Sequence, residues 1–397
     1  MMTAPAPIRI GYCLSLTGSL ADNSRSARLA HEIWREDVDS RGGLLGRPVE
    51  FVRYDDQGDA DLVPGIYKRL IDEDEVDLVI GGYGTNTVLP AMSLIMERER
   101  FFVGLMGLGV NNALLYPNYF AMIPTGPDPN AALTEGFFAL AAEQSPLPET
   151  VALVSADSEF SRNPIIGAKA NAEKYGMKVV HEAAYPLSPE DFAPVIDAVA
   201  ESGSDVLFLC SYLADSIGLV RALRSHEFRP KMVGGAMIGP QNTAVRTELG
   251  PLLNGVVNYE YWAPVPKMMF PGVAELLNAY QERAGEAGVD FLGHYMVPLA
   301  YAQMQVVAQA VEATGGFDDA SLSAYARKET FPTVMGDVRF GAKGEWSEPR
   351  VLQVQFQGVS GHEVGQFQNG SRQIVVSPPE SSSGELIFPY AEAFAAE

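Results

Sequence analysis

Residues that build metal and redox centres are scarce in this chain. Among its 397 residues there are two cysteines and five histidines. Cys13 and Cys210 lie far apart in two apolar segments, which favours free buried thiols over a disulfide and rules out a cysteine zinc site. No two histidines have the spacing that places metal ligands on one face of a helix. We therefore expect no metal and no cofactor.

Positive charge and long apolar runs are also lacking. The chain has 28 lysines and arginines against 50 acidic residues, a net charge of −22. This balance disfavours nucleic acid and anionic membranes as partners. No apolar run approaches the ~18 residues of a transmembrane helix. No signal peptide is visible before the first predicted strand, so two alternatives stay open: a cytoplasmic protein, or one whose native signal was replaced by a start methionine.

Motifs of common enzyme classes are missing too. There is no G-x-S-x-G nucleophile motif and no phosphate-binding P-loop. The glycines of residues 104–109 lack the dinucleotide-binding spacing, so a tight turn is the better interpretation. Asp55 and Asp56 follow a predicted strand, where a solvated strand end is favoured over a cation site. The lack of a catalytic constellation favours a binding protein over an enzyme.

What the chain does have is a glycine-rich turn between a buried strand and a helix. An apolar run predicts a strand at 76–80, and a helix is predicted at 88–99. The turn contains three glycines that permit positive φ and close approach of a ligand: Gly81, Gly82 and Gly84. Three good helix-capping residues follow them: Thr85, Asn86 and Thr87. A helix N-terminus at a sheet edge offers N–H groups to an anion, and without a phosphate motif we expect a carboxylate.

Strand and helix patterns alternate along most of the chain. Further strands are predicted at 8–14, 49–55, 101–105, 119–123, 150–155, 178–184, 205–210, 231–235, 255–261, 336–340 and 352–357. Helices are predicted at 23–40, 62–73, 131–142, 164–175, 192–202, 216–226, 273–287, 295–314 and 322–328. This alternation predicts an α/β fold with parallel sheets. From residue 372 on, the chain is predicted to be a tail rich in proline and serine.

A series of short motifs, in order, resembles one protein family. The motifs are Ile10-Gly11, Ser15-Leu16-Thr17-Gly18, the R-G-G-L-L-G-R-P-V of 41–49, Tyr54-Asp55-Asp56-Gln57, the V-I-G-G-Y-G of 79–84, and 205–209 before Tyr212. The chain thereby resembles, over residues 8–357, the ABC-transporter substrate-binding proteins of the branched-chain amino acid (Leu/Ile/Val-binding) type. That family has the type I periplasmic binding fold.

The resemblance implies two Rossmann-like lobes with parallel sheets, joined by a three-strand hinge. Lobe one would comprise 8–126 plus 256–331, and lobe two 127–255 plus 332–358. Residues 359–397 would form a C-terminal extension. The ligand would lie in a cleft at the C-terminal strand edges, and hinge bending would bury it.

The resemblance also implies ligand-binding positions. Thr85 matches the serine that hydrogen-bonds the ligand's carboxylate, and Gly107 matches a backbone contact. Gly109 and Ala236 match the threonine and the acidic residue that hold the ammonium, so that half of the site is lost. The first-loop aromatic falls near Asn23. The complete predicted set is Thr17, Asn23, Tyr83, Gly84, Thr85, Met106, Gly107, Leu108, Phe160, Tyr212, Ala236 and Met237.

These positions predict a receptor for a small carboxylate-bearing ligand, an aromatic acid rather than a branched-chain amino acid, because an ammonium buried without a counter-charge is costly. The resemblance implies a periplasmic protein, a monomer or weak dimer, that delivers its ligand to an ABC-transporter permease. Two alternatives stay open. One is a cytoplasmic sensor of the amide-regulator kind, and the other is an NAD-dependent enzyme on an α/β scaffold.

Overall fold

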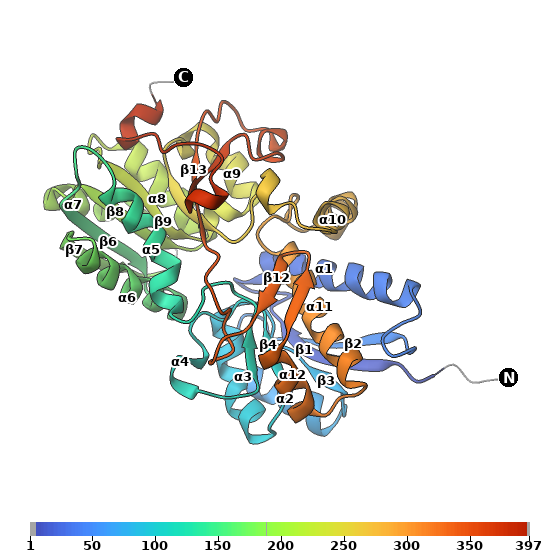
Figure 1. Cartoon of the computed structure of the whole chain (residues 1–397). Coiled ribbons are helices and arrows are strands. Elements are labelled where there is room, and N and C mark those ends of the chain that lie inside the picture. The colour runs from blue at the N-terminus through green and yellow to red at the C-terminus, as the bar shows by residue number, and fades with distance from the viewer. Residues whose placement is uncertain (1–4, 188, 395–397) are drawn as a thin grey trace. The chain divides into compact units, whose positions relative to one another are not determined.

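The computed structural model describes residues 5–187 and 189–394 (Figure 1). The chain forms two compact units, each built from two separate segments. Unit 1 comprises Met1–Pro127 and Phe270–Pro349, and unit 2 comprises Asp128–Met269 and Arg350–Glu397.

Unit 1 is centred on parallel strands. A three-stranded sheet has the order β2-β1-β3, formed by β1 (Ile8–Leu14), β2 (Val49–Asp55) and β3 (Leu78–Val79). A parallel pair, β4 (Phe102–Gly104) and β5 (Tyr119–Ala121), follows, and β11 (Thr330–Thr333) and β12 (Gly336–Arg339) form an antiparallel hairpin. The helices are α1 (Ala21–Ser40), α2 (Val63–Asp72), α3 (Thr85–Glu97), α4 (Asn111–Leu114), α10 (Val273–Ala287), α11 (Val297–Thr314) and α12 (Asp319–Lys328).

Unit 2 contains one seven-stranded sheet with the order β14-β13-β10-β9-β8-β6-β7. Its strands are β6 (Thr150–Ala156), β7 (Lys178–Tyr185), β8 (Val206–Ser211), β9 (Met232–Met237), β10 (Val257–Glu260), β13 (Leu352–Phe356) and β14 (Gln373–Ser377). All neighbours are parallel except β13, which is antiparallel to both β10 and β14. Its α-helices are α5 (Pro129–Ala142), α6 (Glu159–Lys174), α7 (Ala193–Ser202), α8 (Leu213–Ser225) and α9 (Thr243–Leu249). Short 3-10 helices are η1 (Gly239–Gln241), η2 (Gly250–Leu253), η3 (Pro266–Met268), η4 (Val364–Phe367), η5 (Pro379–Ser381) and η6 (Tyr390–Phe394).

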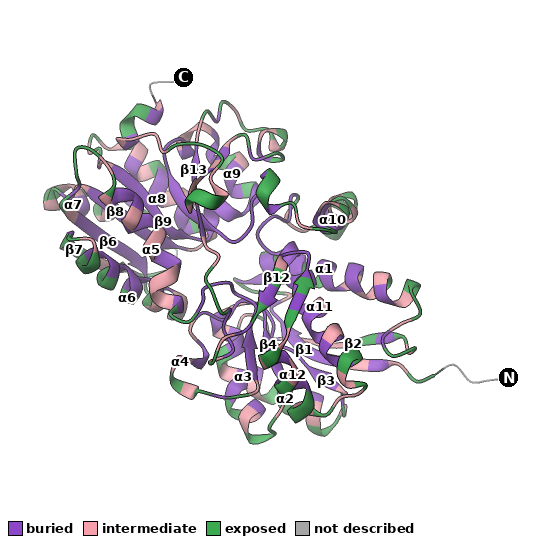
Figure 2. Ribbon diagram, in the orientation of Figure 1, coloured by how far each residue is buried: buried purple, intermediate pink, exposed green. Residues whose placement is uncertain are grey.

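The strands form the core of each unit. Figure 2 shows the strands β6, β8 and β9 as buried ribbon, and every residue of β8 and of β9 is buried. Helix α5 contacts β9, β10 and β13, whereas α6 contacts β6, β7 and β8. Apolar strands without polar alternation are expected where helices cover both faces of a parallel sheet. The predicted α/β fold with parallel sheets is confirmed.

The predicted lobe boundaries differ from the two units at three places. Residues 256–269 belong to unit 2, because β10 pairs with both β9 and β13. Residues 332–349 belong to unit 1, because β11 and β12 form one hairpin that packs on α11. The predicted extension of 359–397 is part of unit 2, since β14 adds an antiparallel strand to its sheet; residues 395–397 lie outside the described part. A boundary placed by motif alone cannot anticipate such pairings.

Four predicted helix starts, those of α3, α6, α8 and α12, lie three or more residues too late. Helix α3 begins at Thr85 rather than 88, because Gly84, at φ +97°, turns the chain into the helix directly. Helix α6 begins at residue 159 rather than 164, because the Ser158 side chain accepts a hydrogen bond from Ser161 N and caps it there. Thr85 is therefore a helical residue and not a cap. Both cysteines are free and buried, as predicted.

Candidate functional site

The turn between β3 and α3 has the close packing that its glycines predict. A Cβ at Gly82 would lie 2.2 Å from Cys13 O, and one at Gly81 would lie 2.8 Å from Gly104 Cα. Neither position therefore tolerates a side chain, and Gly84 needs its positive φ to start α3. The backbone of this turn is fixed by the neighbouring strands.

Thr85 is the first residue of α3 and is 5% exposed. Its Oγ1 accepts a hydrogen bond of 3.1 Å from Leu108 N, in the loop that follows β4. Because Oγ1 is the acceptor in this bond, its own proton stays available for donation. The structure thus joins two predicted site residues within unit 1.

The first turn of α3 also presents backbone donors. The N–H groups of Thr87 and Val88 both bond to Gly84 O. In the described part of the chain, the N–H groups of Thr85 and Asn86 have no acceptor. They lie where the positive end of the helix dipole favours an anion.

The loop after β4 contains two buried apolar side chains. Met106 is 5% exposed and Leu108 1% exposed. A Cβ at Gly107 would lie 2.7 Å from Val110 Cγ2 and 3.1 Å from the Tyr119 hydroxyl, so this position requires glycine. Gly109 has φ +66°. The predicted residues of this loop therefore lie in a closely packed segment beside Thr85.

Asn23 and Tyr83 form a second predicted pair. Asn23, near the start of α1, donates from Nδ2 to the Tyr83 hydroxyl at 2.8 Å, and both side chains are buried. The Tyr83 ring also meets Tyr295 edge-on, with centroids 6.5 Å apart. Asn23 therefore fixes an aromatic residue rather than standing in for one.

Thr17 is exposed, and its hydroxyl is engaged by a carboxylate. Its Oγ1 donates to Asp55 Oδ2 at 2.7 Å, and Asp55 Oδ1 accepts from Leu16 N and Gln57 N at 2.8 Å each. Partial burial raises the pKa of Asp55, but these hydrogen bonds outweigh it and hold the pKa below its ordinary value. Asp55 therefore organises the loop after β1, as a strand-end carboxylate can.

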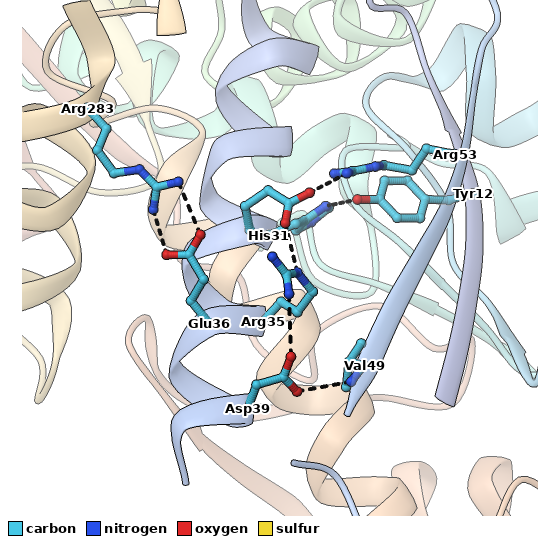
Figure 3. Close-up of polar contacts among 9 residues, drawn as sticks. Tyr12, His31, Arg35, Glu36, Asp39, Val49, Arg53 and Arg283 are labelled. Carbon is cyan, nitrogen blue, oxygen red and sulfur yellow. Dashed lines mark hydrogen bonds and ion pairs between the residues drawn. The ribbon is translucent and has the colours of Figure 1, made fainter. Parts of the chain in front are cut away.

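A buried polar network supports these loops. His31 Nδ1 lies 2.9 Å from the Tyr12 hydroxyl (Figure 3). His31 Nε2 lies 3.1 Å from Gln303 Oε1. Gln303 Nε2 donates to Gly81 O at 2.8 Å and to Val103 O at 2.7 Å. One glutamine amide thus ties the ends of the strands that enter the two candidate loops, a role that the sequence did not reveal.

Unit 2 brings two of its predicted aromatic residues together. Phe160, in the first turn of α6, meets Tyr212 at 6.1 Å between ring centroids. Tyr212 precedes α8, and its carbonyl oxygen accepts from Ser216 N and from Ser216 Oγ. Ser216 Oγ also lies 2.7 Å from Ser211 Oγ. The strand-to-helix turn of unit 2 is therefore held by hydroxyl groups.

Ala236 and Met237 lie at the end of β9, and both are 0% exposed. Asn258 holds the Met237 backbone from both sides: Met237 N donates to Asn258 Oδ1 at 3.0 Å, and Asn258 Nδ2 donates to Met237 O at 2.8 Å. Asn258 is a buried amide in the otherwise apolar start of β10. That polar interruption was the signal in the sequence that could have identified it.

Charged groups are also buried in unit 2. Arg246 and Glu260 form an ion pair at 2.9 Å, and each side chain is 1% exposed. Asp215, in the first turn of α8, is 2% exposed and lies near Tyr185, whose pKa is raised by burial and by this carboxylate. Within the described residues, no cluster of three or more His, Cys, Asp or Glu side chains is arranged to hold a metal ion.

The structure thus groups the predicted residues within each unit. In unit 1 it joins Thr85 to Leu108 and Asn23 to Tyr83, and in unit 2 it joins Phe160 to Tyr212. Sequence reasoning did not identify the supporting residues His31, Gln303 and Asn258, which act by touching these loops from within the fold.

Comparison with known proteins gives extensive matches. A model of a family described as periplasmic binding protein matches residues 7–355. The Leu/Ile/Val-binding protein homolog 8 of Brucella abortus (strain 2308) is 24% identical over 370 residues, which is 89% of each chain.

Solved structures give the same fold. The amino acid ABC transporter substrate-binding protein of Pseudomonas fluorescens Pf-5 matches with a TM-score of 0.79 and 17% identity, over 99% of each chain. A solute-binding protein of an ABC transporter from R. palustris, in complex with benzoate, matches with a TM-score of 0.74 and 14% identity, over 89% of this chain and 94% of that one. Among residues 5–187 and 189–394, no helix has both the length and the apolar character needed to cross a bilayer.

Proposed function

Because the chain belongs to the periplasmic binding protein family, we propose that it is a periplasmic receptor, not an enzyme, that delivers a small carboxylate to the membrane permease of an ABC transporter. One observation carries the proposed ligand class. At the start of α3 the buried hydroxyl of Thr85 lies beside the N–H groups of Thr85 and Asn86, which have no acceptor in the described part of the chain.

This arrangement has the chemistry of a carboxylate site. Two backbone N–H groups and one hydroxyl proton can each bond a carboxylate oxygen, and charge-assisted bonds of this kind are strong. Leu108 N orients Oγ1 as an acceptor, so the hydroxyl proton points elsewhere. The helix dipole adds to the attraction.

The proposed body of the ligand is aromatic. Three buried apolar or aromatic residues lie in the two loops: Tyr83 is two positions before Thr85, Leu108 bonds to Thr85 through its N–H, and Met106 is two positions before Leu108. Gly109 and Ala236, at the positions matching the family's ammonium ligands, have no side-chain acceptor. A benzoate-type acid avoids the cost of an ammonium without a counter-charge. The benzoate complex of the R. palustris protein supports this choice.

Calorimetric titration with sodium benzoate and with leucine tests the ligand class. We expect benzoate-type acids to bind at least ~100-fold more tightly than leucine, a difference of about 2.7 kcal/mol. Micromolar binding of leucine together with no heat from aromatic acids would overturn the proposal.

Substitution of Thr85 tests the site itself. Thr85→Ala removes one charge-assisted hydrogen bond and should weaken binding about tenfold or more, whereas Thr85→Ser keeps the hydroxyl and should have a mild effect. Thr247→Ala, at a half-buried position of α9 whose hydroxyl donates to a carbonyl oxygen of the same helix, is the control. Unchanged affinity in Thr85→Ala would remove Thr85 from the site.

A branched-chain amino acid is the second candidate ligand. The name of the Brucella relative, a Leu/Ile/Val-binding protein homolog, favours it. The same titrations decide between the two: saturable binding of leucine without binding of benzoate would support the second candidate, and the absence of heat from leucine would remove it.

A further inference from the structure

Unit 1 contains a groove between α1 and the C-terminal end of α10. Its volume is about 580 Å³. It is lined by Leu16, Arg25, Arg28, Leu29, Glu32, Arg283, Ala287, Gly288 and Val289. Three of these nine residues are arginines, although the whole chain carries a net charge of −22. A concentration of guanidinium groups in so acidic a protein calls for a physical explanation.

The groove is separate from the proposed carboxylate site. Asn23 on α1 is buried and bonds to Tyr83, next to that site. Arg25 is two positions further on, about 200° around the helix at 3.6 residues per turn. The groove-lining residues of α1 recur at the helical spacing of three and four, so they share the face that is turned away from Asn23.

The acidic groups near the groove are already engaged. Glu32 forms ion pairs with Arg35, at 2.9 Å, and with Arg53. Figure 3 shows Arg283 reaching from α10 to Glu36 on α1, with two hydrogen bonds of 2.8 and 3.2 Å. Glu32 and Glu36 therefore each have at least one guanidinium partner.

Arg25 and Arg28 are the cations left over. Arg25 donates from Nε to Leu16 O at 2.8 Å, which holds its side chain along the groove. Neither arginine forms an ion pair with any residue of the described part of the chain. Their uncompensated charge lies over an apolar floor formed by Leu29, which is 7% exposed.

The carbonyl end of α10 does not cancel this charge. Val289 N donates to Ala284 O at 3.2 Å and Gly288 N to Gly285 O at 3.4 Å, so the last carbonyl groups are partly satisfied within the chain. The groove thus combines a cationic rim, an apolar floor and a volume suited to a small molecule.

We propose that this groove binds a small polyanion, a molecule with at least two negative charges on a short body. Guanidinium groups bind carboxylates and phosphates through the same paired N–H geometry, so di- and tricarboxylates and phosphate compounds share the required chemistry. Arg25 and Arg28 would supply the contacts, and Arg283 would add a third when its pair with Glu36 opens.

Titration calorimetry with citrate and, separately, with pyrophosphate tests the proposal and distinguishes the two sources of charge. The parent protein should bind at least one of them at a single site, with affinity that falls as salt is raised. Arg25→Gln and Arg28→Gln should each weaken binding about tenfold, the effect of losing a hydrogen bond to a charged group. Arg339→Gln, an exposed arginine of β12 in the same unit, should change it less than twofold.

A variant that binds more tightly is also tested, because misfolding of a variant can only weaken binding. Glu36→Gln on α1 frees Arg283 on α10 and should strengthen polyanion binding several-fold. Glu275→Gln, at an exposed position in the first turn of α10, is the control and should not strengthen it. The proposal is overturned if neither anion gives saturable binding, or if the control variants shift affinity as much as the groove variants. Thr85→Ala should leave polyanion binding unchanged, which separates this groove from the proposed carboxylate site.

Discussion

Protonation of His31 should be the main acid-sensitive event beneath the candidate loops of unit 1. Gln303 donates from Nε2 to two carbonyl oxygens, so its Oε1 faces His31 as an acceptor and His31 Nε2 must carry the ring proton. Nδ1 is then the acceptor for the Tyr12 hydroxyl. A second proton would have to enter at Nδ1, against this donor and near the Arg53 guanidinium, which lies 6.0 Å from the Tyr12 ring centroid (Figure 3).

The size of the effect follows from the pKa of this imidazole. Burial, followed by the charge of Arg53, lowers the pKa of His31 from 6.5 to about 3 in the folded protein. The unfolded chain therefore binds a proton below pH 6.5 that the folded chain refuses until about pH 3, so stability falls as the pH drops through this window. Between pH 6.5 and 4.5, two pH units at 1.36 kcal/mol each give a loss of about 2.7 kcal/mol from this one group.

Urea unfolding at pH 7.5 and at pH 4.5 measures that loss. His31→Gln is neutral at both values and should reduce the difference between the two free energies of unfolding by about 2.7 kcal/mol. The comparison uses the pH difference within each protein, so a general destabilisation of the variant cancels. An equal pH difference in parent and His31→Gln would refute the reasoning.

Two further predictions concern buried polar groups of unit 2. Arg246→Met leaves the Glu260 carboxylate, which is 1% exposed, without its guanidinium partner. The free energy of unfolding, measured by urea titration, should fall by roughly 3–5 kcal/mol. A loss below about 1 kcal/mol would show that this ion pair contributes little to stability. Asn258→Ala removes both hydrogen bonds to the Met237 backbone and should lower the free energy of unfolding by about 1–3 kcal/mol. It should also speed hydrogen exchange of the Met237 amide, and unchanged exchange there would contradict the proposed role of Asn258.

Most of the fold could be predicted from the sequence because strand and helix periodicity is a local property. The helix at 273–287 and the strand at 8–14 are observed as predicted. What failed depends on distant partners. The strand β14 was missed because its only local signal is the short run Ile374-Val375-Val376 within a stretch rich in proline and serine, and its pairing with β13 decides the outcome. Helix starts shifted where one glycine or serine, such as Gly84 or Ser158, decided the geometry.

The candidate site likewise contains residues that the sequence predicts and residues that depend on distant partners. The glycine-rich turn and Thr85 could be found from sequence, because a backbone N–H cradle needs glycine and a short polar side chain next to a helix start. The residues that fix this cradle could not, since His31 and Gln303 are separated by 272 positions and meet only in the folded chain. A histidine or glutamine within a helix gives no sign of its partner. Such supporting residues are visible only once the tertiary contacts are known.

The supporting network also explains how a cradle of unpaired donors can persist. Backbone N–H groups without partners are costly when buried, so a flexible loop would rearrange to satisfy them. Here rearrangement is blocked on both sides. A side chain at Gly82 would clash with the Cys13 carbonyl oxygen, 2.2 Å from its Cβ, and Gln303 holds Gly81 O in place from within the unit. The packing around the turn therefore keeps the N–H groups of Thr85 and Asn86 in place without an acceptor in the described part of the chain. A carboxylate that accepts from both, as we propose, would meet a site that is already formed and would lose little free energy to ordering the loop.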